Sequence, residues 1–257
     1  MSNRDDDALD AVLEARMTPR ELAAWKVAKV HDYVWRGKRD PEEVADWLQI
    51  LLSEPHFIQR LKIQRGATMD TEEPRKGWVK IWERFYLEVF GLTVDLSGVA
   101  LSPYQPGFGW VVYVLKELSL NQLFAKCRDL FPSRSDYGDD LDRKIPTEDR
   151  DPRQIGNYAR RFRNRVEPDE ELKNKSANVL HDEGIAGNTF REATTLELFY
   201  FWRTGGHINL VNWNLCAGSR GCDGSVPSVG WSSGCFRVSR GYYPHCSGAY
   251  LRARSAV

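Results

Sequence analysis

The end of the chain, residues 224–257, reads GSVPSVGWSSGCFRVSRGYYPHCSGAYLRARSAV. Apolar positions alternate here with glycine, serine and tyrosine, a pattern typical of short β-strands joined by glycine turns. From Leu215 to Val257 the chain contains no Lys, Glu, Gln, Met, Ile or Thr, although 28% of all residues are charged. This restricted alphabet indicates a constraint on the sequence beyond the needs of folding.

Four of the six missing residue types, Lys, Glu, Gln and Met, share a property of the genetic code. Lys, Glu, Gln, Met and Trp are the amino acids that have no codon ending in a pyrimidine. The runs 232–236 and 242–250 contain only residues that pyrimidine-ending codons can encode. Randomising the first two bases of asparagine-type codons, adenine-adenine-pyrimidine, would produce this set. The pattern therefore points to diversification at adenines in this part of the gene.

With these features, residues 156–257 resemble the variable proteins of diversity-generating retroelements. In such systems a reverse transcriptase copies a template with errors at adenines, and the altered copy replaces the 3′ end of the target gene. Gly230-Trp231 echoes the Gly-Gly-x-Trp signature that many relatives carry, and Leu251–Arg254 is similar to the family's final strand. The resemblance also rests on Tyr158 with its strand, the aromatic stretch Leu196–Trp202, Leu215–Ser219 and Gly224–Pro227.

The resemblance implies a C-type-lectin-like domain, of the subclass shared with formylglycine-generating enzymes. It implies ligand binding through a hypervariable surface, with no catalysis, no cofactor and no metal. Tyrosine with serine and glycine suits such a surface, because antibody paratopes use the same alphabet. Within a variable region of about 214–257, we expect these residues to bind ligand: Ser228, Trp231, Ser232, Ser233, Cys235, Arg237, Arg240, Tyr242, Tyr243, His245, Cys246, Ser247 and Tyr250.

Other residues of the tail are expected to form the scaffold beneath this surface. A surface that tolerates many side chains needs a core that lies elsewhere. The apolar residues between the polar positions suit that role, and they are Val226, Val229, Phe236, Val238, Leu251 and Val257.

The whole chain reads as α+β. We expect a largely helical N-terminal region of unassigned role at 1–135, a linker at 136–155, and the lectin-like domain at 156–257, with small antiparallel sheets and two helices. Capping patterns at Thr18-Pro19 and Asp40-Pro41 predict helices within residues 8–66. Further helices are expected at 78–90, 119–130, 168–172 and 196–204, the last capped by Thr194 or Thr195 and ended by Gly205. Strands are expected at 94–101, 110–115 and 157–163.

Three alternative functions stay open. The clustered Cys216, Cys222, Cys235 and Cys246 could bind zinc, although their spacing lacks the usual C-x2-4-C pairs. A formylglycine-generating-type oxidase would use Cys235 with Cys246, both of which lie in the expected variable set. A nucleic-acid-binding module could use the cluster Arg160, Arg161, Arg163 and Arg165, which is followed at once by acidic residues.

The composition narrows the choice of partner and compartment. The 36 basic and 36 acidic residues give a formal net charge of zero, so no overall field attracts nucleic acid or an anionic membrane. The start of the sequence has no secretion signal, and no apolar run approaches the ~18 residues of a membrane span. We therefore expect a cytoplasmic protein whose partner is a protein or cell-surface ligand.

Overall fold

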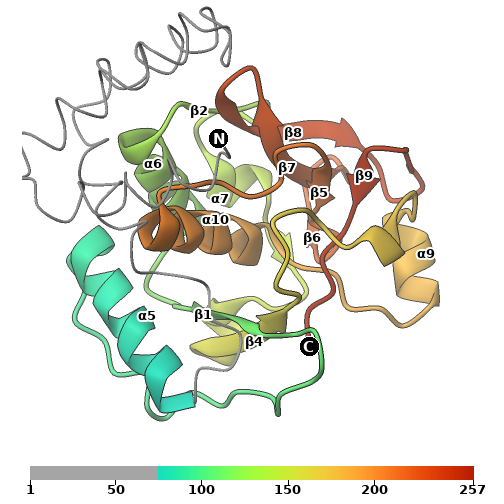
Figure 1. Cartoon of the computed structure of the whole chain (residues 1–257). Coiled ribbons are helices and arrows are strands. Elements are labelled where there is room, and N and C mark those ends of the chain that lie inside the picture. The colour runs from blue at the N-terminus through green and yellow to red at the C-terminus, as the bar shows by residue number, and fades with distance from the viewer. Residues whose placement is uncertain (1–74) are drawn as a thin grey trace, which may run out of the picture. The chain divides into compact units, whose positions relative to one another are not determined.

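The computed structural model describes residues 75–257, so the helices expected within 8–66 lie outside the described residues. This part of the chain is α+β (Figure 1). Its helices are α5 (Arg75–Phe90), α6 (Leu120–Leu130), α7 (Leu141–Lys144), α8 (Pro152–Ile155), the 3-10 helix η1 (Glu170–Leu172), α9 (Ala177–Asp182) and α10 (Phe190–Thr204). Its strands are β1 (Trp110–Val114), β2 (Ser133–Ser135), β3 (Thr147–Glu148), β4 (Tyr158–Phe162), β5 (Trp213–Leu215), β6 (Ser219–Arg220), β7 (Val226–Ser232), β8 (Cys235–Tyr242) and β9 (Leu251–Arg252).

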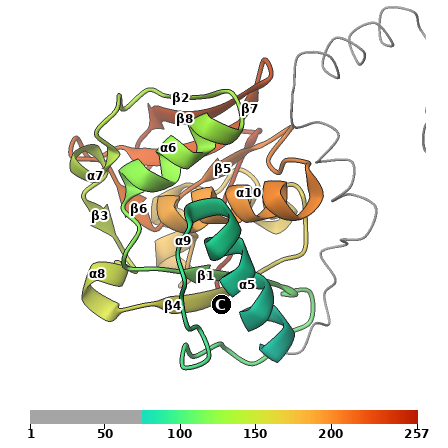
Figure 2. The same ribbon diagram turned by 90° about the vertical axis from the view of Figure 1, so that its left-hand side faces the viewer.

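Helix α10 is the central element, and it lies between the largest sheet and the β1–β4 pair (Figures 1 and 2). It starts at a capping box, in which the Thr189 hydroxyl accepts from the Glu192 amide and the Glu192 carboxylate accepts from the Thr189 amide. It ends at Gly205, which has the left-handed conformation expected of a helix-ending glycine. The expected cap at Thr194 or Thr195 is incorrect, since both residues are buried inside the helix.

The largest sheet has the strand order β2-β8-β7-β5-β9. Strands β5, β7 and β8 pair antiparallel, whereas β2 and β9 join the edges in parallel, so this sheet is mixed rather than antiparallel. The pairs β1–β4 and β3–β6 are antiparallel, as expected of small sheets. One face of the large sheet adds Val229, Phe236 and Val238 to the main core, and the other adds Leu215 and Leu251 to a second cluster beside α9.

The main core unites segments from both sides of the expected linker. Trp82 of α5 stacks on Phe199 of α10 with 3.9 Å between ring centroids, and its indole nitrogen donates to the Val111 carbonyl. Residues 136–155, expected as a linker, also contribute to the core through Tyr137, Leu141 and Ile145. Residues 75–135 and 156–257 are therefore parts of one folding unit. Three apolar residues of this polar segment are buried, whereas Ile155 at its end is exposed.

The segment 94–101, expected as a strand, is a loop. Its backbone bonds to α5 and to itself: the Leu96 amide donates to the Glu83 carboxylate of α5, and the Val99 amide donates to the Leu96 carbonyl. The other expected strands correspond to β1 and β4. Among residues 75–257, no helix has both the length and the apolar character that crossing a bilayer requires.

Candidate ligand-binding surface

The β7–β8 hairpin forms one end of the candidate surface. Ser232 pairs with Cys235, so the hairpin has a two-residue turn at Ser233-Gly234. Both turn residues have positive φ, 53° and 69°, as a type I′ turn requires. Along β8 the side chains alternate: Phe236 and Val238 are fully buried, whereas Cys235, Arg237 and Ser239 are partly exposed. This strand thus separates a scaffold face from an accessible face.

The positions expected to bind ligand are at least partly exposed, with one exception. Ser228 is completely buried because β7 is an interior strand, and there Ser228 pairs with Leu215 of β5 and Ser239 of β8. The exposed ones are Ser233, Arg240, Tyr243, His245, Ser247 and Tyr250, and the half-buried ones are Trp231, Ser232, Cys235, Arg237, Tyr242 and Cys246. Of the expected scaffold residues, all are fully buried except Val257, which is partly exposed.

Trp231 is half-buried because its ring is anchored to the core. Its ring centroid lies 3.7 Å from that of His207, and its indole nitrogen donates to the Glu197 carboxylate at 3.2 Å. Glu197 is fully buried in α10 and is also bonded to His207 Nδ1 at 2.7 Å. Trp231 therefore joins the hairpin to α10, and only part of its ring is available to a ligand.

Two arginines on β8 are held by nearby carboxylates. Arg237 lies 3.3 Å from Asp136, and Arg240 lies 3.1 Å from Asp223. The Asp223 carboxylate also accepts hydrogen bonds from Ser225, and these bonds hold its pKa below the usual range. Such exposed pairs add little stability, but they restrict the directions in which the guanidinium groups point.

The loop from Tyr243 to Tyr250 is held mainly by main-chain bonds. The Pro244 carbonyl accepts from the Asn178 amide of α9 at 2.9 Å, and the Tyr250 carbonyl accepts from the Trp213 amide at 2.8 Å. Tyr243 and Tyr250 are 44% and 68% exposed. Because backbone atoms fix the loop, its side chains can differ without removing these bonds.

A neighbouring apolar loop was missed by the sequence reasoning. Leu210 and Val211 are 51% and 69% exposed. The Glu167 carboxylate accepts from the amides of residues 210, 211 and 212, and the Trp231 amide donates to the Asn209 carbonyl. This rigid loop thus borders β7. The sequence signal that could have revealed this loop is the pair of adjacent aliphatic residues between Asn209 and Asn212.

The cysteines do not form a cluster. Among residues 75–257, no group of three or more His, Cys, Asp or Glu side chains is placed to hold a metal ion. Cys216 is buried, and burial raises the pKa of its thiol well above the usual range, whereas Cys222 is exposed. Cys235 begins β8 and Cys246 follows its other end, so a strand of roughly 20 Å separates their attachment points.

Three of the four arginines expected as a phosphate-binding cluster are engaged within the chain. Arg161 Nε donates to the Ser102 carbonyl at 2.8 Å, and Arg163 lies 3.4 Å from the buried Asp169. Arg165 forms two hydrogen bonds with Glu171, at 2.6 and 2.9 Å, and lowers the pKa of that carboxyl to about 2. These contacts leave few free donors for nucleic acid.

No protein-family model matches the chain, and neither a curated protein nor a solved structure shows significant similarity to it.

Proposed function

We propose that this chain is the variable protein of a diversity-generating retroelement. It binds ligands through the C-terminal surface of a C-type-lectin-like domain and has no catalytic turnover. The ligand is a protein or cell-surface molecule, recognised by shape and side-chain chemistry. The name lectin-like describes the fold and carries no implication of sugar binding.

One observation carries the proposal: the two runs that pyrimidine-ending codons can encode are accessible at every position except Phe236. The runs 232–236 and 242–250 supply the hairpin turn and the exposed loop, while the buried Phe236 and Val238 alternate with accessible neighbours. Side chains that do not support the core can vary with little effect on stability, since substitutions at such surface sites usually change it by within about 0.5 kcal/mol. Main-chain anchoring of the loop adds to this tolerance.

The test is deep sequencing of the 3′ end of this gene across its source population. We expect substitutions to gather at Ser232, Ser233, Cys235 and at accessible positions of 242–250, and to spare Val238 and Leu251. The changed positions should correspond to adenines in a nearby near-repeat of the gene's end, and this repeat should lie beside a reverse-transcriptase gene. A tail that is uniform between individuals, in a genome without that repeat, would contradict the proposal.

A binding experiment separates this function from nucleic-acid binding. Variants that share residues 1–231 but carry different residues at the accessible tail positions should select different protein ligands from a cell-surface display library. Binding that is the same for all tails and falls steeply with added salt would instead favour phosphate contacts by the arginines of β4.

A further inference from the structure

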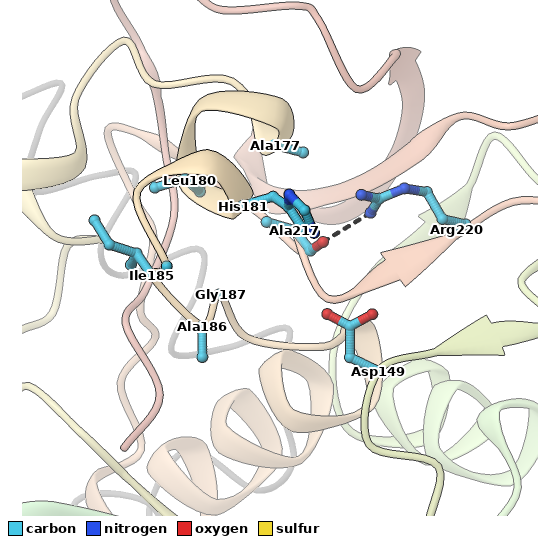
Figure 3. A pocket seen from close by; sticks show the side chains of 10 residues that line it. Asp149, Ala177, Leu180, His181, Ile185, Ala186, Gly187, Ala217 and Arg220 are labelled. Carbon is cyan, nitrogen blue, oxygen red and sulfur yellow. Dashed lines mark hydrogen bonds between the residues drawn. The ribbon is translucent and has the colours of Figure 1, made fainter.

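A pocket of about 250 Å³ lies between α9, the segment 184–187 and the β3–β6 pair (Figure 3). None of the residues named above as expected ligand-binding positions lines it, so it is distinct from the proposed ligand-binding surface, although Ala217 and Arg220 fall within the expected variable region. Its volume equals that of about eight water molecules at ~30 Å³ each, which suits a small metabolite. The lining residues are Asp149, Ala177, Leu180, His181, Gly184, Ile185, Ala186, Gly187, Ala217 and Arg220.

Arg220 is fixed in position by the chain beside the pocket. Its Nη1 donates to the Ala217 carbonyl at 2.7 Å and to the Ser219 carbonyl at 2.8 Å. These bonds use one nitrogen of the guanidinium group and orient the whole plane. Within residues 75–257, its Nε and Nη2 atoms form no hydrogen bond with the protein and Arg220 forms no ion pair. A planar guanidinium held in this way is suited to bind a carboxylate by donating hydrogen bonds to its oxygens.

Asp149 directly follows β3, the strand that pairs with β6, so it lies on the same side of the pocket as Arg220 (Figure 3). The Asp149 amide donates to the Gly218 carbonyl at 2.8 Å, and this bond holds the Asp149 backbone in position beside the pocket. Within the described part of the chain, the Asp149 carboxylate accepts no hydrogen bond and is not paired with Arg220. An acid and a base thus face one pocket without neutralising each other.

The floor of the pocket, beyond these two charges, is apolar. Ala177 and Leu180 of α9 and Ala217 belong to the second hydrophobic cluster, with Ile185 packed against them. Gly187 approaches Ala217 so closely that a Cβ atom on Gly187 would lie 2.7 Å from the Ala217 Cβ. A ligand with a short alkyl group would cover this floor.

We propose that this pocket binds a free α-amino acid with an aliphatic side chain. The ligand's carboxylate pairs with Arg220, its ammonium group pairs with Asp149, and its alkyl group lies on the floor formed by α9 and Ala217. Small-molecule sites commonly combine a mainly apolar lining with a few polar groups that fix orientation. The inference does not depend on diversification of the tail.

The test is an amide NMR titration of the full chain with leucine, isoleucine and valine, each to about 10 mM, which reaches weak metabolite affinities. We expect saturable shifts at residues 177–187 and 217–220 with at least one of them. The analogues 4-methylpentanoate, which lacks the ammonium group, and 3-methylbutylamine, which lacks the carboxylate, should bind at least about tenfold more weakly.

Asp149→Asn and Arg220→Gln should each weaken binding by at least about tenfold, whereas the matched surface changes Asp139→Asn and Arg143→Gln should leave it unchanged. No saturable shift with any of the three amino acids would overturn the proposal. Binding of either analogue by the wild-type chain as tightly as the amino acid would also overturn it, even if a substituted variant fails to fold. Uniform tails in the sequencing experiment would contradict the proposed function and leave this result unaffected.

Discussion

Glu192 is a single residue on which several parts of the fold depend. Its buried carboxylate accepts from Arg150 Nε at 2.7 Å, from the Tyr158 hydroxyl at 3.0 Å and from the Thr189 amide at 2.8 Å. We expect Glu192→Gln to lower the free energy of unfolding by about 3–5 kcal/mol, because it leaves the Arg150 guanidinium without its buried counter-charge. Urea denaturation followed by tryptophan fluorescence measures the change.

The control is Asp129→Asn, which removes the exposed partner of Lys126 and should change stability by under about 0.5 kcal/mol. A loss for Glu192→Gln as small as that of the control would mean that the buried pair contributes no net stability.

Asp169 gives a pH dependence with an unusual sign. Burial raises the pKa of its carboxyl, against the lowering effects of the Ser255 amide and of Arg254. The native state therefore binds this proton more readily than the unfolded chain, whose aspartate pKa is about 3.9. Stability from this group is present at low pH and decreases as pH rises from about 3.9 through the raised native pKa.

We therefore expect the wild type to lose stability relative to Asp169→Asn as pH rises from about 4 to 7, because the amide stays neutral throughout. Urea denaturation at a series of pH values measures the difference. Parallel curves for the two proteins would show that the native pKa of Asp169 is not raised.

For single residues, burial can be predicted from the sequence where it follows from alternation along one strand. The prediction is wrong where burial depends on neighbouring strands. The alternation of β8 places Phe236 and Val238 inside, as expected. Ser228 was expected outside because its own type is polar, but β5 and β8 enclose it. Trp231 likewise depends on Glu197 and His207, which are distant in the sequence.

Among the elements, the β7–β8 turn makes a specific prediction. Ser233 has φ of 53°, a region in which asparagine is better tolerated than serine, and asparagine before glycine is the preferred type I′ pair. We expect Ser233→Asn to raise the free energy of unfolding by about 0.5–1 kcal/mol. Thermal unfolding and urea unfolding should both show that the Ser233→Asn variant is more stable than the wild type.

Ser247→Asn is the matched control, because Ser247 is exposed outside this turn and should respond by under about 0.5 kcal/mol. Asparagine is also the residue that an unmodified adenine-adenine-pyrimidine codon encodes. A destabilised Ser233→Asn variant would show that the turn is not the type I′ turn its φ values indicate.

Element prediction from the sequence succeeds where a local signal is complete. Helix α6 begins after Ser119, whose side chain forms a capping box with Gln122. The start of α10 was misplaced, although Thr189 followed by Glu192 is the same kind of signal. The expected strand at 94–101 failed because its apolar residues have no strand to pair with.

At the scale of the whole molecule, the shared core predicts that residues 156–257 do not fold when expressed alone. The fragment would lack α5, β1 and α6, whose Trp82, Val111 and Phe124 pack in the same cluster as Phe199. We expect dispersed NMR signals and a cooperative transition from the full chain and neither from the fragment. A fragment that unfolds cooperatively would restore the boundary expected at 136–155.

The boundary at 136–155 was inferred from the polar composition of this segment. Composition does not show which of its residues pack into the core. Residues 136–155 are mostly polar, yet Tyr137, Leu141 and Ile145 reach the core, and the Asp142 carboxylate accepts from the Leu120 and Asn121 amides of α6. The proposed binding role rests mainly on the tail alphabet, which is a property of the sequence and not of the packing.

The anchoring of residues 243–250 has a consequence for what evolution can do with this surface. The carbonyls of Pro244 and Tyr250 are bonded to α9 and β5 near the two ends of the loop. An inserted or deleted residue would move one anchor out of reach of its partner, whereas an exchanged side chain leaves both in place. Antibody loops vary in both sequence and length. This segment should tolerate substitutions but not insertions or deletions.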